Sequence, residues 1–111
     1  MIDTKTMKYI GSFSVDSGQA MIGDPWYLDN WEDWNGEPGD EPFNSYETKA
    51  GEYGYLGACG VTLKQGYGEL GNSSSVVFTT GYGDGLYPVY AEFNDGGRVA
   101  RIVVDFIGDE E

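Results

Sequence analysis

A chain of 111 residues with a formal net charge of −13 is long enough to bury the single hydrophobic core of one domain. The charge excludes a surface for nucleic acid or anionic membrane, because six lysines and arginines face nineteen acids. The composition also excludes wholesale disorder and triads that need histidine, since 40% of the residues are hydrophobic and histidine is missing.

Cysteine usage and hydropathy bear on the cellular compartment. The single cysteine, Cys59, lies in the apolar run Leu56 to Val61, which predicts a reduced, buried, structural thiol and excludes the usual cysteine and histidine zinc site. No apolar run approaches the roughly 20 residues of a membrane span, and MIDTKTMKYI lacks the apolar stretch of a secretion signal. We therefore expect a cytoplasmic protein.

Two strands are predicted at the start of the chain. Alternating apolar and polar residues from Thr6 to Val15 predict a half-buried strand. Residues Asp16 to Gln19 are turn formers, and Gly18 accepts a left-handed conformation. The apolar run Ala20 to Ile22 then predicts a second strand, paired with the first as a hairpin. It ends at Gly23-Asp24-Pro25, because proline has no amide hydrogen for a sheet.

The segment from residue 24 to 48 carries eight acids and no base. Asp24 as N-cap and Pro25 as first helical residue predict a short helix over Pro25 to Trp34. Its three-residue apolar spacing places three side chains on one face: Leu28, Trp31 and Trp34. Glycine and proline between Asn35 and Ser45 predict an exposed acidic loop.

Three more segments precede the C-terminal strands. The apolar stretch Tyr53 to Gln65 contains Gly54, Gly57 and Gly60 at three-residue intervals and is predicted to be a buried strand with bulges or close packing. Gly66 to Gly71 follows as a short strand or loop. The β-branched run Ser75 to Thr80 predicts another strand.

The clearest alternation lies between Gly81 and Phe106 and predicts a β-hairpin. Its turn, Asn94 to Gly97, contains residue types that accept positive φ angles. One apolar face is expected on each strand, comprising Tyr87, Val89, Ala91 and Phe93 in the first and Ala100, Ile102, Val104 and Phe106 in the second. The glycine-rich loop Gly81 to Gly85 before the hairpin is expected to contribute to any site.

These elements predict a mainly β fold, a small antiparallel β-sandwich or open barrel with at most one short helix near residues 25–34. We expect a single β-rich domain over residues 1–111, with an acidic aromatic loop at 24–48. Six or seven strands without a strand–helix–strand rhythm support this fold class.

Three aspartates occupy turns beside glycine at the ends of predicted strands: Asp16, Asp24 and Asp84. If they converge, their carboxylates could bind Ca²⁺ or Mg²⁺, which prefer oxygen ligands, and such a site could support hydrolysis. The alternative is that each aspartate only stabilises its own turn through local backbone hydrogen bonds.

The aromatic residues near Asp24 also allow two interpretations. Trp26, Trp31 and Trp34 can cap one open end of the fold together with Phe43. Alternatively, with Asp24 and Asp84, they form a surface on which tryptophan anchors a basic partner protein and carboxylates attract it.

A small nucleotide signal is a further candidate ligand. Arg98 and Arg101 on the last strand are the phosphate-binding candidates, together with Lys8 or Lys64. The alternative for these arginines is cross-strand pairing with acids of the hairpin, Glu92 and Asp105.

The chain contains three short motifs, which are Asp16-Ser17-Gly18, Gly23-Asp24-Pro25 and the stretch Gly83 to Tyr90, GDGLYPVY. In these motifs it resembles an uncharacterised family found in bacteria and their phages. Many relatives have cysteine after Gly-Asp-Pro, where this chain has Trp26. The resemblance brings no established activity and implies a phage or bacterial accessory protein that acts by binding.

These observations favour a non-enzymatic binding protein that sequesters or blocks a host partner, of the inhibitor or anti-defence type. A divalent-metal hydrolase and a nucleotide-signal sponge are the alternatives. The expected partner is a basic host protein or a small-molecule signal, and a homo-oligomer is compatible with the sequence.

Overall fold

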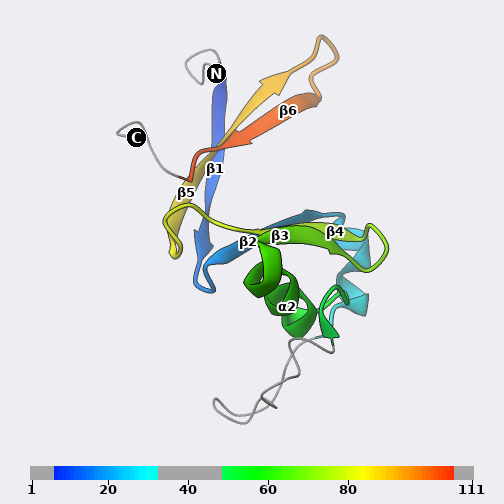
Figure 1. Ribbon diagram of the computed structural model, residues 1–111. Helices are drawn as coiled ribbons and strands as arrows, with labels where there is room; N and C mark the ends of the chain where they lie inside the picture. The colour runs from blue at the N-terminus through cyan, green and yellow to red at the C-terminus, as the bar shows by residue number, and fades with distance from the viewer. Residues whose placement is uncertain (1–6, 33–48, 107–111) are drawn as a thin grey trace. The chain divides into compact units, whose positions relative to one another are not determined.

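A computed structural model describes residues 7–32 and 49–106, and the chain divides into two compact units. The first unit comprises Met1–Gly18 and Thr80–Glu111, and the second comprises Gln19–Thr79. The chain therefore leaves the first unit after Gly18 and re-enters it at Thr80 (Figure 1).

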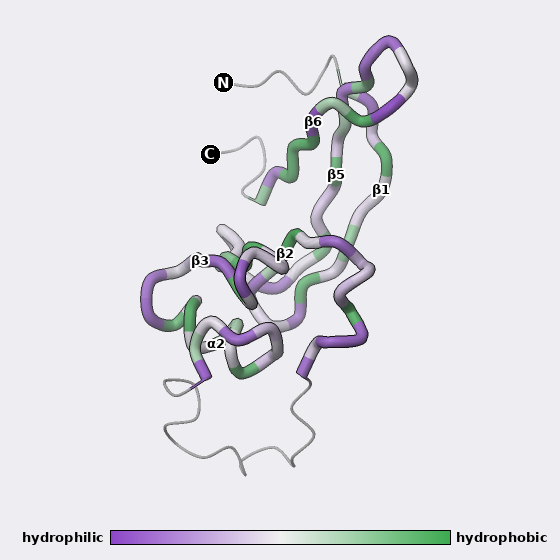
Figure 2. Tube along the Cα trace, turned by 90° about the vertical axis from the view of Figure 1, so that its right-hand side faces the viewer, coloured by the Kyte–Doolittle hydropathy of each residue, from purple (hydrophilic) through white to green (hydrophobic). Residues whose placement is uncertain are grey.

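The first unit contains a three-stranded antiparallel sheet with the strand order β1-β5-β6. Its strands are β1 (Lys8–Val15), β5 (Gly85–Phe93) and β6 (Val99–Val104). The strand predicted before Val15 and the C-terminal hairpin are both confirmed. Much of β6 is apolar (Figure 2).

The turn between β5 and β6 depends on Asn94. Its amide donates to the carbonyl of Arg98 at 2.8 Å, and its side-chain Oδ1 accepts from the amides of Gly96 and Arg98. Gly97 has a φ of 81°, a left-handed value that favours glycine. Residue types alone were sufficient to predict this turn, because its hydrogen bonds are local.

The buried hydrophobic side chains described in the first unit come from β1 and β5. Val15, Tyr87 and Ala91 are buried, and the ring of Phe106 meets that of Tyr87 edge-on with centroids 4.9 Å apart. The predicted apolar face is thus buried at its centre. Towards the β5–β6 turn it is open, since Phe93 is 42% exposed.

The second unit contains a sheet with the strand order β2-β4-β3, also antiparallel. Its strands are β2 (Gln19–Gly23), β3 (Tyr67–Leu70) and β4 (Ser75–Thr79). An α-helix, α2 (Tyr55–Gln65), precedes β3 in the chain. A mainly β fold with two open antiparallel sheets and a short helix is confirmed.

The predicted hairpin between β1 and β2 is wrong. β1 pairs with β5 and β2 pairs with β4, so the two strands belong to different sheets. Gly18, with a φ of 70°, still forms a turn between them. The residue types of Asp16 to Gln19 predicted the bend at this point correctly, but they do not determine which strands pair, because the partners β5 and β4 lie far away in the sequence.

The predicted strand at Tyr53 to Gln65 is also wrong, because most of this segment is α2. A three-residue glycine spacing places small residues along one side of a helix. A Cβ atom at Gly57 would lie 2.0 Å from the carbonyl oxygen of Glu52, so the glycine allows close backbone packing. Gly66, with a φ of 90°, ends the helix in the left-handed conformation. Tertiary packing here outweighs the poor helix propensity of glycine.

The predicted helix after Asp24 is present but shorter. It is a 3-10 helix, η2 (Pro25–Asn30), in which Asp24 Oδ1 accepts from the amide of Trp26 at 2.9 Å. The predicted cap and first residue are confirmed. Trp31 follows the last helical residue, so it does not share a helix face with Leu28. Trp34 and the acidic loop at 35–45 lie outside the described residues.

The core of the second unit joins its sheet to α2. Buried residues from both elements and from the segment before the helix form one cluster, comprising Tyr53, Ala58, Leu70 and Val77. Met21, Trp31 and Val61 pack against it. Across residues 7–32 and 49–106, no helix is long and apolar enough to cross a membrane.

Leucine-to-alanine changes at two positions test this core. Leu70 is fully buried and Leu63, on α2, is 74% exposed. We expect Leu70→Ala to lower the free energy of unfolding by about 3 kcal/mol, because it removes packed methyl groups and leaves a cavity. Leu63→Ala, the matched control, should change it by less than about 0.5 kcal/mol. Urea denaturation of both variants measures the difference, and equal losses would contradict the assignment of Leu70 to the core.

Candidate functional site

The glycine-rich loop before β5 and the residue preceding this loop are hydrogen-bonded to the backbone of Gly18, which follows β1. Asp84 Oδ1 accepts from the amide of Gly18 at 2.8 Å, over 66 residues of sequence. The Gly18 carbonyl in turn accepts from the amide of Thr80 at 3.0 Å. Both backbone groups of Gly18 are therefore bound to the chain that returns to the first unit. We refer to Gly18, Thr80, Gly83, Asp84 and Tyr87 as the junction.

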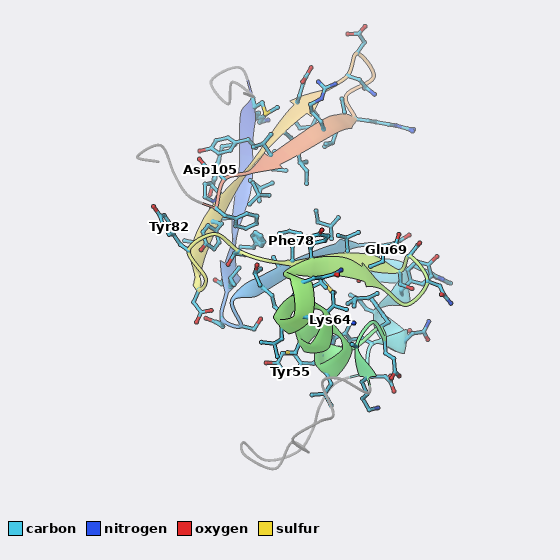
Figure 3. The ribbon with its side chains drawn as sticks, viewed as in Figure 1. Tyr55, Lys64, Glu69, Phe78, Tyr82 and Asp105 are labelled. Atoms are coloured by element: carbon cyan, nitrogen blue, oxygen red, sulfur yellow. The ribbon has the colours of Figure 1, made fainter. Side chains whose placement is uncertain are left out.

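Inside the junction, Gly83 is the common acceptor. Its carbonyl accepts from the hydroxyl of Thr80 at 2.5 Å and from the hydroxyl of Tyr87 at 2.8 Å. Its amide donates to the Thr80 carbonyl at 3.2 Å, and its φ is 79°. Tyr82, in the same loop, points outward and is 60% exposed (Figure 3). The polar groups of Thr80 and Tyr87, both buried, are thus satisfied locally.

The residues that the structure describes contain no cluster of metal-binding side chains that would support the metal hypothesis. Within residues 7–32 and 49–106, no group of three or more acids or cysteines is arranged to hold an ion. Asp16 and Asp84 belong to the first unit, and Asp24 belongs to the second. Asp84 accepts a hydrogen bond from the amide of Gly18, and Asp24 accepts one from the amide of Trp26. These are the local bonds expected of turn and cap residues.

The most exposed aromatic side chain described lies on η2. Trp26 is 82% exposed, its neighbours Tyr27 and Leu28 are 39% and 54% exposed, and no residue of η2 is buried. We call Pro25–Asn30 the Trp26 segment. A fully displayed indole is unusual, since tryptophan is highly buried on average in folded proteins.

Trp31 has a different position from Trp26. Its ring meets Tyr53 edge-on with centroids 5.1 Å apart, and it packs against the core of the second unit. The next residue, Glu32, donates its amide to the Tyr53 carbonyl and accepts from the amide of Tyr55. The Trp26 segment is thus fixed at its C-terminal end, while its own aromatic side chains face solvent.

The arginines proposed as phosphate ligands differ in their partners. The Arg101 guanidinium donates through Nη1 to Glu92 Oε1, its cross-strand neighbour. This is the pairing expected as the alternative to a phosphate site. Arg98 lies at the turn, where its amide donates to Asn94 Oδ1. Lys8 Nζ lies 6.0 Å above the ring of Phe93, within reach of a cation–π interaction.

One polar arrangement in the second unit was missed from the sequence. Cys59 is half-buried on α2, and its Sγ accepts from Gln19 Nε2 at 3.3 Å. The side-chain carbonyl of Gln19 lies 3.0 Å from the hydroxyl of Thr62. The sequence pattern predicts that Gln19 belongs to a turn and that residues 53–65 form a strand. Neither prediction places Gln19 beside Cys59 and Thr62. No sequence signal links these residues across about forty positions.

A comparison with family models places most of the chain in one group. The model described as a protein of unknown function (DUF4241) matches residues 4–104, which span both compact units. Comparison with curated proteins and with solved structures gives no match. The matched range contains the junction and the Trp26 segment.

Substitutions of Asp84 separate a turn role from a metal role. Asp84→Ala removes the acceptor for the Gly18 amide and should lower the free energy of unfolding by about 1 kcal/mol. Asp84→Asn keeps a side-chain oxygen at the same position and should retain most of that stability. Asp16→Ala, at an exposed neighbouring acid, is the control and should stay within about 0.5 kcal/mol of the wild type.

Thermal unfolding with and without Ca²⁺, Mg²⁺ and Mn²⁺ completes this test. A turn role predicts the same melting temperature in all of these solutions. Stabilisation by a cation that is lost in Asp84→Asn would contradict it, because the amide keeps the hydrogen bond but binds a divalent cation more weakly than the negatively charged carboxylate does.

Proposed function

The chain belongs to the DUF4241 family of proteins of unknown function, and from this premise we propose that it is a non-enzymatic binding protein. In this proposal it is a phage or bacterial accessory factor that sequesters or blocks a basic host protein. The observation that carries the proposal is the 82% exposure of Trp26 on a helix without a buried residue.

An indole displayed in this way suits a binding anchor. Tryptophan is among the residues that contribute most to protein–protein interfaces, because it buries a large apolar area and can donate one hydrogen bond. Tyr27 and Leu28 extend the apolar area on the same short helix. Burial of these side chains against a partner would recover the free energy that their exposure to water costs.

The Trp26 segment is held in place before any partner arrives. Asp24 caps its first turn, and Trp31 packs on the core immediately after its last residue. A segment that is already ordered loses less conformational entropy on binding, which raises its affinity for a given contact area. The core contact of Trp31 therefore supports the exposed position of Trp26.

Charge defines the class of partner. The chain carries −13 in total, and residues 24–48 contain eight acids without a base. A strongly acidic surface accelerates association with a basic protein through long-range attraction and disfavours acidic partners. The Trp26 segment itself contains Asp29 and no basic residue. An aromatic anchor with acids nearby in sequence thus fits a partner that presents an apolar pocket among lysines and arginines.

The non-enzymatic part of the proposal rests on the chemistry of the available groups. Histidine is missing from the sequence, so a neutral-pH general base of the commonest type is not available. Asp84, the acid of the glycine-rich loop, accepts a hydrogen bond from a backbone amide, which supports a structural role over a catalytic one. The bacterial or phage origin of the partner system follows only from the motif resemblance described above.

Trp26→Ala tests the anchor. The wild-type chain, immobilised and exposed to bacterial lysate, should capture one or a few basic proteins. We expect Trp26→Ala to reduce that capture at least about tenfold, as for a central interface tryptophan. Leu63→Ala is the matched control, because it removes another exposed apolar side chain of the second unit.

Two outcomes would overturn the proposal. The first is capture by Trp26→Ala that equals capture by the wild type and by Leu63→Ala. The second is capture that does not weaken as salt is raised, since screening reduces attraction between an acidic chain and a basic partner. Circular dichroism of the variants confirms that they fold.

A further inference from the structure

We infer that the chain forms a symmetric dimer in which the outer edges of two β6 strands pair antiparallel, with Val103 at the two-fold axis. β6 is the last strand of the β1-β5-β6 sheet. An edge strand presents a row of backbone N–H and C=O groups that can pair with another strand. This inference concerns the first unit and is independent of Trp26.

β6 has few of the features that protect edges from pairing. Its sequence, VARIVV, contains no proline and no lysine. Its one charge, Arg101, is paired with Glu92 of the adjacent strand. The first four residues of β6 are exposed, with Val99 at 49% and Ile102 at 44%. Among residues 7–32 and 49–106, no strand pairs with the outer edge of β6, and this edge carries exposed apolar side chains.

The regular part of this edge begins at Arg101. The register between β5 and β6 shifts between Glu92 and Phe93, so the start of β6 is irregular. From Arg101 to Val104 each residue has one partner on β5 in an unbroken register. A bulge disturbs pairing on a strand, which restricts a second copy to the stretch from Arg101 onward.

Backbone geometry limits the registers that two identical strands can adopt. Opposed residues in an antiparallel pair direct their backbone groups either both towards or both away from each other. The two-fold axis of a self-paired strand therefore passes beside one residue, which faces its own copy. Near the middle of the regular stretch, only a few residues can lie on the two-fold axis. The side-chain charges that each choice of axis residue would bring together distinguish between them.

Charge selects the axis at Val103. An axis at Arg101 would oppose two arginines, which is destabilising. An axis at Ile102 would place Arg101 opposite Val103 and form no charged pair. An axis at Val103 places Arg101 opposite Asp105 of the second copy and Ile102 opposite its Val104. Asp105 directly follows β6 and is half-buried (Figure 3).

The charged residues at the β6 edge fit a second copy of the same chain. The two charges of the pair belong to the same five-residue stretch, so symmetry forms the Arg101–Asp105 contact twice, once on each side of Val103. Glu92 would remain beside Arg101 and complete a three-residue charge cluster. The product is a continuous six-stranded sheet in which both β6 edges are covered.

A cysteine at the axis tests the register directly. In a Cys59→Ser background, which leaves no other thiol, Val103→Cys should form a covalent dimer on mild oxidation. Opposed residues across antiparallel strands have Cβ atoms about 4.5–5.5 Å apart, close to the range that a disulfide bridges. Ser14→Cys, at an exposed position on the opposite edge strand β1, is the matched control and should form far less dimer.

Sedimentation equilibrium tests the dimer without a cross-link. The wild-type mass should rise from monomer towards dimer between micromolar and millimolar concentration, as expected for a small interface. Val103→Lys should remain monomeric, because it places two ammonium groups opposite each other at the axis. A wild type that stays monomeric at millimolar concentration, or a Val103→Cys yield no greater than that of Ser14→Cys, overturns the inference. If Val103→Lys fails to fold, the wild-type mass and the cysteine comparison decide.

Discussion

The bonds at Gly18 join the two segments of the first unit at which the chain leaves this unit and returns to it. The polypeptide passes between its compact units only at Gly18–Gln19 and at Thr79–Thr80. Gly18 accepts from the amide of Thr80 and donates its own amide to Asp84, so the outgoing and returning segments are joined to each other. Each segment then continues directly into a strand of each sheet. These hydrogen bonds lie close in sequence to the ends of β1 and β4 and to the starts of β2 and β5.

The same acidic charge has opposite consequences for the two proposed interactions. A net charge of −13 attracts a basic partner and repels a second copy of the chain. Added salt should therefore weaken binding through the Trp26 segment and strengthen pairing through β6. The local Arg101–Asp105 pairs act against this repulsion at short range. Association with a partner and self-association are in this way distinguishable by ionic strength alone.

Trp26 and Trp31 lie five residues apart in one sequence pattern, but they differ in burial. Trp31 packs on Tyr53 and closes the core of the second unit, whereas Trp26 is exposed on η2. Both interpretations offered by the sequence, end-capping and partner binding, have a candidate residue in the structure. Spacing could not separate them, because a helix of three-residue period was expected to continue through Trp34 and η2 ends at Asn30.

Local signals determined much of this protein by themselves. They predicted the turn at Asn94, the Asp24 cap, the positions of the strands β1, β4, β5 and β6, and the Glu92–Arg101 pair, because each signal comes from residues close in sequence or opposed in one hairpin. The tertiary structure decided the rest. It made α2 a helix because glycines allow close backbone packing, separated β1 from β2, and directed Asp84 to Gly18. These outcomes depend on competition between distant partners for the same backbone groups and apolar surface, and periodicity along the chain does not contain that information.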